Sequence, residues 1–583
     1  MSEKLISLYR ERLAKEKGAV RKDWGGRLSV ALVYPDQYYI GMSNLGFLAV
    51  YAMLNGREDV VAERVFLPEP GEMSLHLETG KGLFSMESLS PLTRFDLIAF
   101  SLSFENTYPN ILKILSLGKI PLLSSEREEF HPLVTAGGIT VFLNPEPLSS
   151  FFDFFLLGEG EAILDEFIDL YRELKTRRMP REEVLRHLSE ALRFVYVPSF
   201  YHVSYHKDGT IKAREPTEGS APPRIQVPRL ALADAPVTTS TLLTPETEFA
   251  DRVLIELGRG CGRSCRFCAA GHVYRPPRYH RESDLMACVE MAIERKDRVG
   301  LLSASVLDTP GIERITQLLA KSGCDFSVSS LRADSLTPSL VEDLWKAGQR
   351  TLAIAPEAGS ERLRRVVNKH LGHEQIIDAV RLITRVGDFH LRLYFLLGLP
   401  TEGKEDVEAI LELVKSIKHH MVKESRTRGR LRQIKLSINC FVPKPFTPFQ
   451  WFPMESLSEL KEKQKWLKNA LNREGGIKVS FDLPKWAYTQ ALLSLGDRRV
   501  GPILLLLNQH GDWSKALQYS EVNPDFFVYR PKDPDENLPW DFIDHGIHKE
   551  HLFREYKLAL KGEESEVCQV GECKRCGVCV TTG

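Results

Sequence analysis

Cys261, Cys265 and Cys268 have the spacing C-x-x-x-C-x-x-C, which brings three thiols together on one short loop. Thiolates are the usual ligands of iron–sulfur clusters, which are most often held by four cysteines. Three thiolates can hold three irons of a four-iron cluster and leave the fourth iron open. An open iron can bind a chelating substrate through an amine and a carboxylate. The spacing therefore predicts a cluster that takes part in chemistry.

Two other interpretations of this loop are open. A structural zinc site requires four nitrogen or sulfur ligands, and the nearest candidates for the fourth are His272 and His280. The thiols can also be small buried residues without a ligand role. The surroundings favour the cluster, because glycines on both sides of Cys261 let the backbone wrap closely around an inorganic core. The apolar run at 252–257 predicts a buried strand directly before the loop.

The cysteine spacing resembles that of the radical S-adenosylmethionine superfamily, and Phe267 stands before the third cysteine, as is common there. In that superfamily the open iron binds the methionine end of S-adenosylmethionine. An electron from the cluster then splits the sulfonium and yields a 5′-deoxyadenosyl radical. The resemblance implies that Cys261, Cys265 and Cys268 hold a 4Fe-4S cluster, and that S-adenosylmethionine is a cofactor.

The elements that position this loop belong to a predicted barrel at residues 251–455. Strands and helices alternate through this stretch, which is the pattern of parallel βα units. The predicted strands are 252–257, 299–305, 325–329, 351–355, 390–397 and 434–441. They fit the partial (β/α)6 TIM-type barrel of the superfamily that the chain resembles, and chemistry in such barrels belongs at the loops after the strands.

Polar residues and one glycine follow the predicted strands at that edge. They are Ser303, Ser305, Ser329, Arg332, Glu357 and Gly398. The resemblance implies that Ser303 and Ser305 receive the amino group of S-adenosylmethionine, and that Ser329 and Arg332 suit its ribose hydroxyls and carboxylate. Glu357 can accept from the ribose or the amine, and Gly398 would let the backbone approach adenine. A helix cap or a loop salt bridge is the alternative for each residue.

A second α/β unit is predicted at residues 28–198. Helical stretches alternate there with apolar runs at 28–34, 60–67, 96–102, 132–136 and 154–157. That alternation predicts a doubly wound, Rossmann-like parallel sheet. Ligands of such sheets lie over the carboxyl ends of the strands.

The loops at those ends resemble the cobalamin-binding pattern D-x-H-x-x-G … S-x-L … G-G. The matching residues are Asp36, Tyr38, Gly41, Ser101, Ser103, Gly137 and Gly138. Tyr38 stands where the pattern has the histidine that ligates cobalt, and Ser103 stands where it has leucine. If cobalamin binds, no histidine of this loop can hold its lower face, but its dimethylbenzimidazole tail can lie beside Gly137 and Gly138. A degenerate sheet domain that binds no ligand is the alternative.

The remaining segments connect or extend these two units. Residues 1–27 carry an N-terminal helix, residues 199–250 form a linker with a hairpin, and residues 456–583 form a mainly helical region. That region ends in four close cysteines, Cys568, Cys573, Cys576 and Cys579. Their overlapping C-x-x-C spacing resembles that of ferredoxins. It predicts a second iron–sulfur cluster or a zinc site, with redox-labile thiols as the alternative.

Composition limits the partners of the chain. Lys and Arg number 77 and Asp and Glu number 78, so the formal net charge is −1 and no global basic field indicates nucleic acid. The basic stretch 423–432 can contact phosphate, so RNA stays an open partner, although a solvated excursion is the simpler interpretation. The apolar runs are shorter than the ~18 residues of a membrane span, and the N-terminus lacks the apolar core of a signal peptide. We therefore expect a cytoplasmic protein without a membrane partner.

Together with the cysteines, the blocks at 329–332, 394–402 and 441–451 resemble a radical SAM subgroup with an N-terminal cobalamin-binding-like domain. The resemblance implies an enzyme in which methylcobalamin methylates an unactivated carbon. An electron donor such as flavodoxin or ferredoxin is expected. Two alternatives stay open: a radical rearrangement, redox or sulfur-insertion enzyme without methyl transfer, and a binding subunit associated with RNA modification. The substrate is not indicated.

Overall fold

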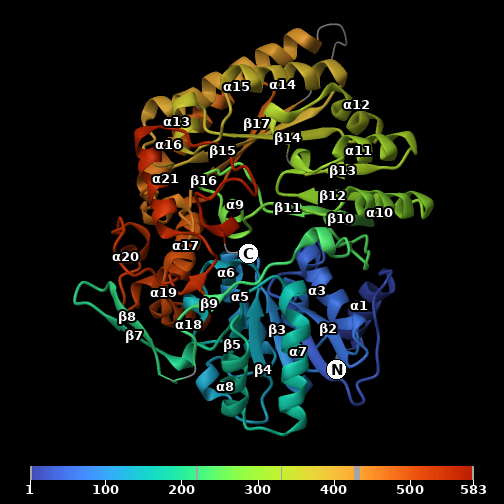
Figure 1. The fold of residues 1–583 in the computed structure, drawn as a ribbon, viewed down its shortest axis with the longest axis vertical. Coiled ribbons are helices and arrows are strands. Elements are labelled where there is room, and N and C mark those ends of the chain that lie inside the picture. The colour runs from blue at the N-terminus through green and yellow to red at the C-terminus, as the bar shows by residue number, and fades with distance from the viewer. Residues whose placement is uncertain (1–2, 218, 220, 330, 426–432, 581–583) are drawn as a thin grey trace.

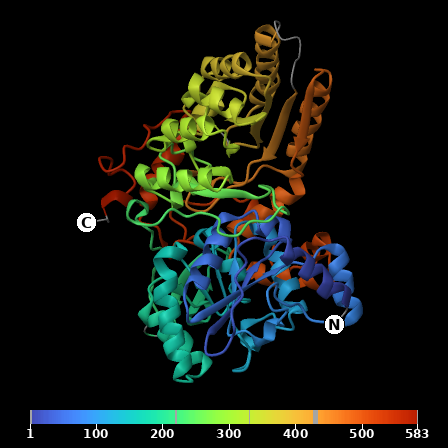
Figure 2. The ribbon, with the colours of Figure 1, turned by 90° about the vertical axis from the view of Figure 1, so that its right-hand side faces the viewer.

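The computed structural model describes residues 3–217, 219, 221–329, 331–425 and 433–580. Two α/β units lie one above the other, and the C-terminal segments run along one side of both (Figure 1). The view turned by 90° shows the same stacking of the two units (Figure 2). The contact between the units is therefore where a site shared by both sheets can form.

The N-terminal unit is built on one sheet with the strand order β2-β1-β3-β4-β5-β6. Its strands are β1 (Leu28–Tyr34), β2 (Val60–Phe66), β3 (Leu97–Ser101), β4 (Leu133–Gly137), β5 (Phe154–Leu156) and β6 (Val195–Tyr196). Neighbouring strands pair in parallel, except β5 and β6, which pair antiparallel. Every residue of β1 and β2 is buried, as is usual for parallel strands covered on both faces. The predicted doubly wound sheet is confirmed, and its strand order reverses at β1 and β3, where such folds bind ligands.

The helices of this unit connect its strands. They are α1 (Glu3–Ala14), α2 (Tyr38–Gly41), α3 (Leu45–Gly56), α4 (Pro70–Thr79), α5 (Tyr108–Leu117), α6 (Ile139–Leu143), α7 (Gly160–Thr176) and α8 (Arg181–Ala191). Asn44 caps α3, because its side-chain oxygen accepts a 2.9 Å hydrogen bond from the Phe47 amide. The cap fixes the start of α3, which follows β1 after the short helix α2.

The linker forms the expected hairpin and also holds the C-terminal region. Strands β7 (Tyr201–Tyr205) and β8 (Ile211–Pro216) pair antiparallel. Gly209 in the turn between them has a φ of +88°, which glycine adopts without strain. Further on, β9 (Ile225–Gln226) pairs in parallel with β18 (Ile543–Asp544) from the far end of the chain.

The upper unit is made of two parallel sheets. The first has the order β11-β10-β12-β13, and the second has the order β14-β15-β16-β17. Their bounds are β10 (Arg252–Arg259), β11 (Arg278–Tyr279), β12 (Arg298–Ser303), β13 (Phe326–Val328), β14 (Thr351–Glu357), β15 (His390–Leu397), β16 (Ile434–Cys440) and β17 (Ile477–Phe481). The short strand β11 is antiparallel to β10, and a bridge between Leu331 and Ile354 joins the two sheets. The predicted barrel strands are confirmed as β10, β12, β13, β14, β15 and β16.

Helices alternate with these strands as the sequence predicts. They are α9 (Ala270–Val273), α10 (Glu282–Glu294), α11 (Ile312–Lys321), α12 (Pro338–Lys346), α13 (Glu361–Val366), α14 (His373–Val386) and α15 (Lys404–Ser425). Strand β17 is an addition, because the sequence analysis expects a mainly helical region from residue 456. Ile477, Val479 and Phe481 alternate with polar residues, and this period of two is the pattern of a half-buried strand.

The C-terminal region links the two units. Its helices are α16 (Leu457–Asn472), α17 (Pro484–Leu495), α18 (Gly501–His510), α19 (Trp513–Gln518), α20 (Asp525–Val528) and α21 (Lys549–Lys561). The Asn144 side chain of the lower unit donates to the Ser494 carbonyl at 3.1 Å, and Glu146 pairs with Arg498 at 3.0 Å. Among the described residues, no helix combines the length and apolar character needed to cross a membrane.

Candidate functional site

The three cysteines of the loop after β10 line one cavity of about 250 Å³. Gly260 leads the chain into this loop with a φ of +81°, and a Cβ on it would lie 2.4 Å from the Tyr274 carbonyl oxygen. Only glycine fits there, so the local sequence fixes the path of the loop. We call this space the thiol cavity; its polar lining includes Arg263, Ser305, Arg332, Asp334, Glu357 and Lys369.

Burial dominates the electrostatics of the thiols. It raises the pKa of Cys268 to about 12, with a further upward contribution from the Cys265 thiol. Burial also raises the pKa of Cys261, and Cys265 again adds to the shift. Cys261 and Cys268 therefore favour the protonated form when no cation is bound. A bound cation reverses this preference, because it stabilises the thiolate form.

Ser305 and Arg263 form one polar group at the mouth of the thiol cavity. The Ser305 hydroxyl donates to Asp308 at 2.6 Å, and the Arg263 Nε donates to the same carboxylate at 3.0 Å. Burial acts to raise the pKa of Asp308, but the hydrogen bonds from Arg263 and Ser305 outweigh it, so that pKa lies below its ordinary value. The end of β12 thus places an ion pair beside the cysteine loop.

Arg332 and Glu357 line the same cavity, as the sequence predicts, and each is paired. The Arg332 guanidinium donates to Asp334 at 3.0 and 2.9 Å. Glu357 has a φ of +67° and accepts a 2.9 Å hydrogen bond from the Lys369 ammonium. Burial acts to lower the pKa of Lys369, but Glu357 and the Cys265 thiol raise it above its ordinary value. Lys369 is therefore a charged group of this site.

The sequence analysis does not find Lys369, because no motif marks it. Lys369 lies between α13 and α14 and more than a hundred residues after Cys265. Only the fold brings its side chain to the thiols. The sequence points to Lys369 only indirectly. A buried cation must have a partner, and Glu357 is the acid that pairs with Lys369.

Gly398 lines neither the thiol cavity nor the larger cavity between the two units that is described below. Its amide donates to Glu402 at 2.9 Å, and the position of a Cβ is crowded by Glu455 at 2.9 Å and Leu460 at 3.0 Å. The expected contact of this glycine with adenine stays a prediction. Its φ of +82° explains the glycine as a tight turn after β15.

A second and larger cavity of about 590 Å³ lies between the two units. The carboxyl ends of β3 and β4 contribute Ser101, Ser103, Gly137 and Gly138, as the sequence predicts. The barrel contributes Ser303 and Ser329, together with glycines before the cysteine loop. Ala304 lines both this inter-unit cavity and the thiol cavity. Ser303 and Ser329, expected beside S-adenosylmethionine, thus lie on the side that faces the lower sheet.

Gly137 and Gly138 of the lower sheet differ in how much room a side chain would have at each position. Gly138 has a φ of +110°, and a Cβ on it would lie 2.4 Å from the Leu102 carbonyl oxygen, so the turn itself requires glycine. At Gly137 the nearest atom to a Cβ is the Leu156 carbonyl oxygen at 3.5 Å, which is ordinary contact. The missing side chain at Gly137 therefore leaves open volume in the cavity.

Acidic residues after β5 and a single arginine form the charged part of the inter-unit cavity. Glu159 and Glu161 lie at the start of α7, and Glu256 lies on β10. The Arg259 guanidinium pairs with all three, at 3.1 Å for Glu159 and 2.8 Å for Glu256. The sequence analysis does not single out this junction between the units.

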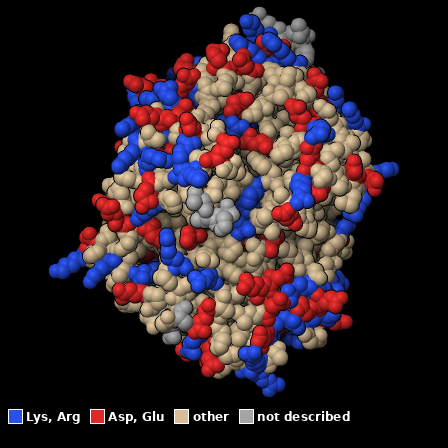
Figure 3. Space-filling model, viewed as in Figure 1, with Lys and Arg blue, Asp and Glu red and all other residues tan. Residues whose placement is uncertain are grey.

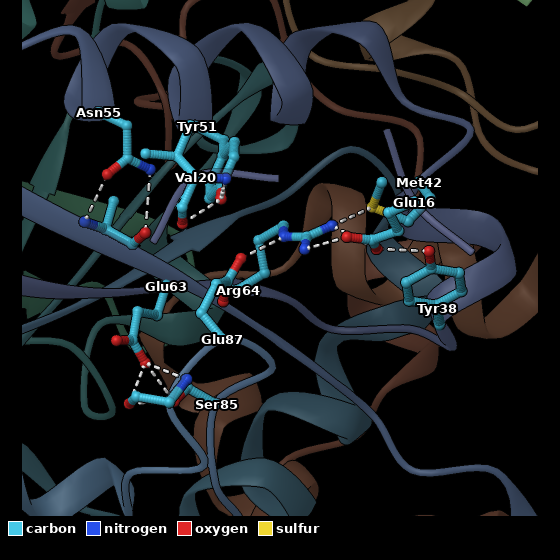
Figure 4. A network of polar contacts seen from close by, with 12 residues as sticks. Glu16, Val20, Tyr38, Met42, Tyr51, Asn55, Glu63, Arg64, Ser85 and Glu87 are labelled. Atoms are coloured by element: carbon cyan, nitrogen blue, oxygen red, sulfur yellow. Dashed lines mark hydrogen bonds and ion pairs between the residues drawn. The ribbon is translucent and has the colours of Figure 1, made fainter. Parts of the chain in front are cut away.

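Tyr38, Asp36 and Gly41 lie outside the inter-unit cavity. The Tyr38 ring is buried, and its hydroxyl donates to Glu16 at 2.6 Å. Figure 4 shows the network that holds it, in which Glu16 and Glu87 flank the buried Arg64. Burial, and then Glu16, raise the pKa of Tyr38 above its ordinary value. The tyrosine at the place of the cobalt-ligating histidine is thus a core residue that anchors the N-terminal segment.

The C-terminal cysteines lie against the cysteine loop. The Cys568 amide donates a 3.0 Å hydrogen bond to the carbonyl of Gly262, the residue after Cys261. Burial raises the pKa of Cys568; Arg275 opposes the shift, and Cys573, Cys576 and Cys579 add to it. Cys568, Cys573 and Cys576 line one small cavity, and a metal held by the four tail cysteines stays a prediction.

The zinc interpretation of the loop requires a fourth ligand near its thiols. His272 and His280 are buried, and neither ring of the two makes a hydrogen bond. Neither lines the thiol cavity; His272 instead lines a small cavity beside the C-terminal cysteines. Within the described part of the chain, no three His, Cys, Asp or Glu side chains are arranged to hold a single metal ion.

Surface charge offers no strong single-sign field on the face of Figure 3, where acidic and basic side chains are interspersed. This agrees with the near-zero net charge. The basic stretch 423–432 lies largely outside the described residues, as residues 426–432 are not among them. The expectation of an RNA contact there stays a prediction.

Comparisons with known proteins match both units. The family model described as "Radical SAM superfamily" matches residues 255–414, and the one described as "Radical SAM proteins, N-terminal" matches residues 46–198. An uncharacterized protein of Methanocaldococcus jannaschii is 30% identical, over 82% of this chain and 90% of the relative. An uncharacterized methyltransferase of Pyrococcus horikoshii is 23% identical, over 45% of this chain and 52% of the relative.

More distant similarities are also found. The tRNA-2-methylthio-N(6)-dimethylallyladenosine synthase of Sorangium cellulosum is 24% identical, over 33% of this chain and 44% of the relative. The chain thus spans about half or less of these last two relatives. Among solved structures, the radical S-adenosylmethionine methyltransferase TsrM of Kitasatospora setae, with cobalamin and a [4Fe-4S] cluster bound, is 13% identical. It aligns with a TM-score of 0.46, over 71% of this chain and 75% of that one.

Proposed function

We propose that this chain, which belongs to the radical SAM superfamily, is a cobalamin-dependent enzyme that methylates an unactivated carbon. That the chain is a radical SAM enzyme is the premise, and the family implies a 4Fe-4S cluster and S-adenosylmethionine. Methyl transfer and the use of cobalamin are the proposal. The inter-unit cavity is the observation that carries it, because this cavity joins the ligand edge of the lower sheet to the barrel and borders the thiol cavity.

The thiol cavity fits the cluster and S-adenosylmethionine. Cys261, Cys265 and Cys268 would hold three irons, since three thiols that line one cavity suit a cationic centre. When bound, the cluster and S-adenosylmethionine supply the radical that removes a hydrogen atom from the substrate. Lys369 and Arg332 offer cations to the carboxylate of the methionine end, while Glu357 and Asp334 offer acceptors to its amine. These ion pairs keep each charge compensated before the ligand arrives.

The inter-unit cavity fits a large organic cofactor. Its volume of about 590 Å³ lies within the usual range for ligand sites, roughly 300–1,000 Å³. The open position at Gly137 and the hydroxyls of Ser101 and Ser103 line its lower side. Cobalamin bound there would supply the methyl group. Asp36, Tyr38 and Gly41 do not line this cavity, so these three residues would not hold the cofactor there.

A substitution that fills the cavity tests the proposal. In Gly137→Leu the new side chain occupies open cavity volume without a backbone clash. Protein reconstituted without oxygen is mixed with hydroxocobalamin, desalted and scanned for the absorbance of bound corrin. We expect the wild type to retain cobalamin and the variant to lose it while keeping its iron. Gly56→Leu is the matched control, because its Cβ meets only open space at the exposed end of α3.

Sulfur insertion is the second candidate function. It is favoured by the similarity to the methylthio synthase and by the cysteine-rich tail beside the loop. Cobalamin retention separates the two functions: 5′-deoxyadenosine formation without cobalamin retention would favour sulfur insertion, a redox reaction or a rearrangement. If dithionite-reduced protein forms no 5′-deoxyadenosine, a binding subunit is favoured instead. A flavodoxin or ferredoxin as electron donor is part of the proposal.

A further inference from the structure

The segment after α21, residues 562–580, is fastened to the cysteine loop by several contacts. We call this segment the tail. The Ser565 amide donates to the Asn368 side chain at 2.9 Å, and the same side chain donates to the Ser264 carbonyl at 3.2 Å. Cys568 is bonded directly to Gly262, as described above. One asparagine thus ties the tail to the chain between Cys261 and Cys265.

Helix α21 brings the tail to this place through a buried ion pair. The Arg266 side chain lies inside the cysteine motif, is fully buried, and pairs with Glu555 at 3.1 Å. Arg266 also donates to the Val366 carbonyl at 3.0 Å. Because both charges lie in the interior, separating them is costly. The buried ion pair therefore fixes the position of the tail against the cysteine loop, although the two segments are distant in the sequence.

The face of the tail that meets the loop carries groups that suit a metal–sulfur centre. Cys568, Cys573 and Cys576 line a small cavity with His272 and Arg275. His272 is 1% exposed, and neither of its ring nitrogens makes a hydrogen bond of good geometry. A buried polar group without a partner is costly. A sulfur atom of a cluster would give the His272 N–H an acceptor.

We propose that Cys568, Cys573, Cys576 and Cys579 hold a second iron–sulfur cluster that delivers electrons to the cluster of the cysteine loop. The inference rests on the proposed function for the reaction that the electron serves. A low-potential one-electron protein of the flavodoxin or ferredoxin class gives up one electron and is oxidised by one unit. That electron passes through the tail site to the loop site, and no proton or other bond changes on the way. The hydrogen bond between Cys568 and Gly262 joins the two ligand-bearing segments directly.

The tail has to rearrange when such a cluster binds. The cavity beside its cysteines encloses only about 10 Å³. The tail must therefore open around a four-iron core, and ligation removes the thiol protons. We expect the loaded tail to resist proteolysis, and the metal-free tail to be cut between residues 562 and 580.

Iron content and spectra of separate variants test whether the site exists. The full-length chain is reconstituted as wild type, as the loop variant with Cys261, Cys265 and Cys268 changed to serine, and as the tail variant with all four tail cysteines changed to serine. We expect about eight irons per wild-type chain and about four per variant, with a distinct paramagnetic signal in each reduced variant. Replacing Cys288 and Cys324 by serine is the matched control and should leave the iron count unchanged. A tail variant with wild-type iron, or zinc in the tail of the loop variant, would overturn the proposal.

Electron delivery is tested by changing the reductant. Formation of 5′-deoxyadenosine is measured with dithionite and with reduced flavodoxin, and the ratio of the two rates is compared between wild type and the tail variant. We expect the tail variant to lose most of the flavodoxin-driven rate relative to the dithionite-driven rate. An unchanged ratio would refute electron delivery by the tail. If the wild type forms no 5′-deoxyadenosine with either reductant, the proposed function fails, while the iron counts still decide whether the tail binds a cluster.

Discussion

The cysteine loop and the tail are neighbours, but they are held in different ways. The loop follows the buried strand β10 and turns at Gly260, where only glycine fits. The tail follows α21 and has no strand or helix under Cys568, Cys573 or Cys576 in the described structure. Its position depends on backbone hydrogen bonds and on the Asn368 side chain. Spacing alone predicts metal ligands in both places, whereas the structure gives the loop a cavity of about 250 Å³ and the tail one of only about 10 Å³.

The largest expected effect comes from removing a thiol of the loop. Cys268→Ser removes one of the three thiols that line the thiol cavity, so we expect the loss of about four irons per chain and of all 5′-deoxyadenosine formation. Cys573→Ser at the more open tail should leave the loop signal in place. Iron analysis and the spectrum of the reduced protein measure both results. Loss of the loop signal or of 5′-deoxyadenosine formation in Cys573→Ser would contradict the independence of the two sites.

The comparison also shows how far the sequence leads. The cysteine spacing, the strand ends with Ser305, Arg332 and Glu357, and the open position at Gly137 all follow from local patterns. Periodicity predicts strands, and the ends of parallel strands meet at one edge. Residues that act at that edge are therefore visible before the fold is known.

Other features depend on the tertiary structure. Lys369 reaches the thiols only because α13 and α14 place their connection beside Glu357. Tyr38 matches a ligand position of a known pattern, yet its hydroxyl is taken by Glu16 in the core. Gly398 follows a barrel strand, but Glu455 and Leu460 fill the space in front of it. In each case the surroundings of the residue come from tertiary contacts that no local pattern marks.

The second largest effect concerns the ion pair between loop and tail. Arg266→Met leaves the buried Glu555 carboxylate without its cation, and breaking a buried pair costs about 3–5 kcal/mol. We expect a corresponding loss in the free energy of unfolding, measured by urea denaturation. Arg314→Met removes the exposed pair with Glu282 and is the control, with an expected cost of about 0–1 kcal/mol. Similar costs for both variants would show that Arg266 does not anchor α21.

A smaller loss of stability is expected when the pH is lowered, and it comes from His545 in the segment before α21. The His545 ring is buried, shares a 2.9 Å hydrogen bond with the Phe142 carbonyl, and packs against Phe446. Burial lowers the pKa of His545 to about 3. The unfolded chain therefore takes up a proton first as the pH falls, and stability that is complete above about 6.5 is lost progressively below it.

The predicted loss of stability at low pH can be measured directly for His545. Between pH 7.5 and 5.5 the histidine should cost about 1.4 kcal/mol of stability. Hydrogen exchange, expressed as protection factors, should show the loss in residues 543–561 and not in β10. His545→Gln keeps a hydrogen-bond donor without titrating, so its protection should not change over this pH range. A loss of protection in β10 of equal size would mean that the loop and the tail region open together.

The smallest effect is expected at Gly262, where the tail touches the loop. A Cβ there would lie 3.6 Å from the Cys568 carbonyl oxygen and 3.9 Å from its Cβ, which is ordinary contact. Gly262→Ala should therefore change the free energy of unfolding by less than about 0.5 kcal/mol and leave the iron count unchanged. Gly260→Ala places a methyl group 2.4 Å from the Tyr274 carbonyl oxygen at a φ of +81°, so it should destabilise the loop and lower its iron content. If Gly262→Ala alone releases the tail iron, the position of the tail depends on close approach of its backbone to Gly262 and not on the Cys568 hydrogen bond. The contact between tail and loop would then tolerate less change than the irregular structure of the tail indicates.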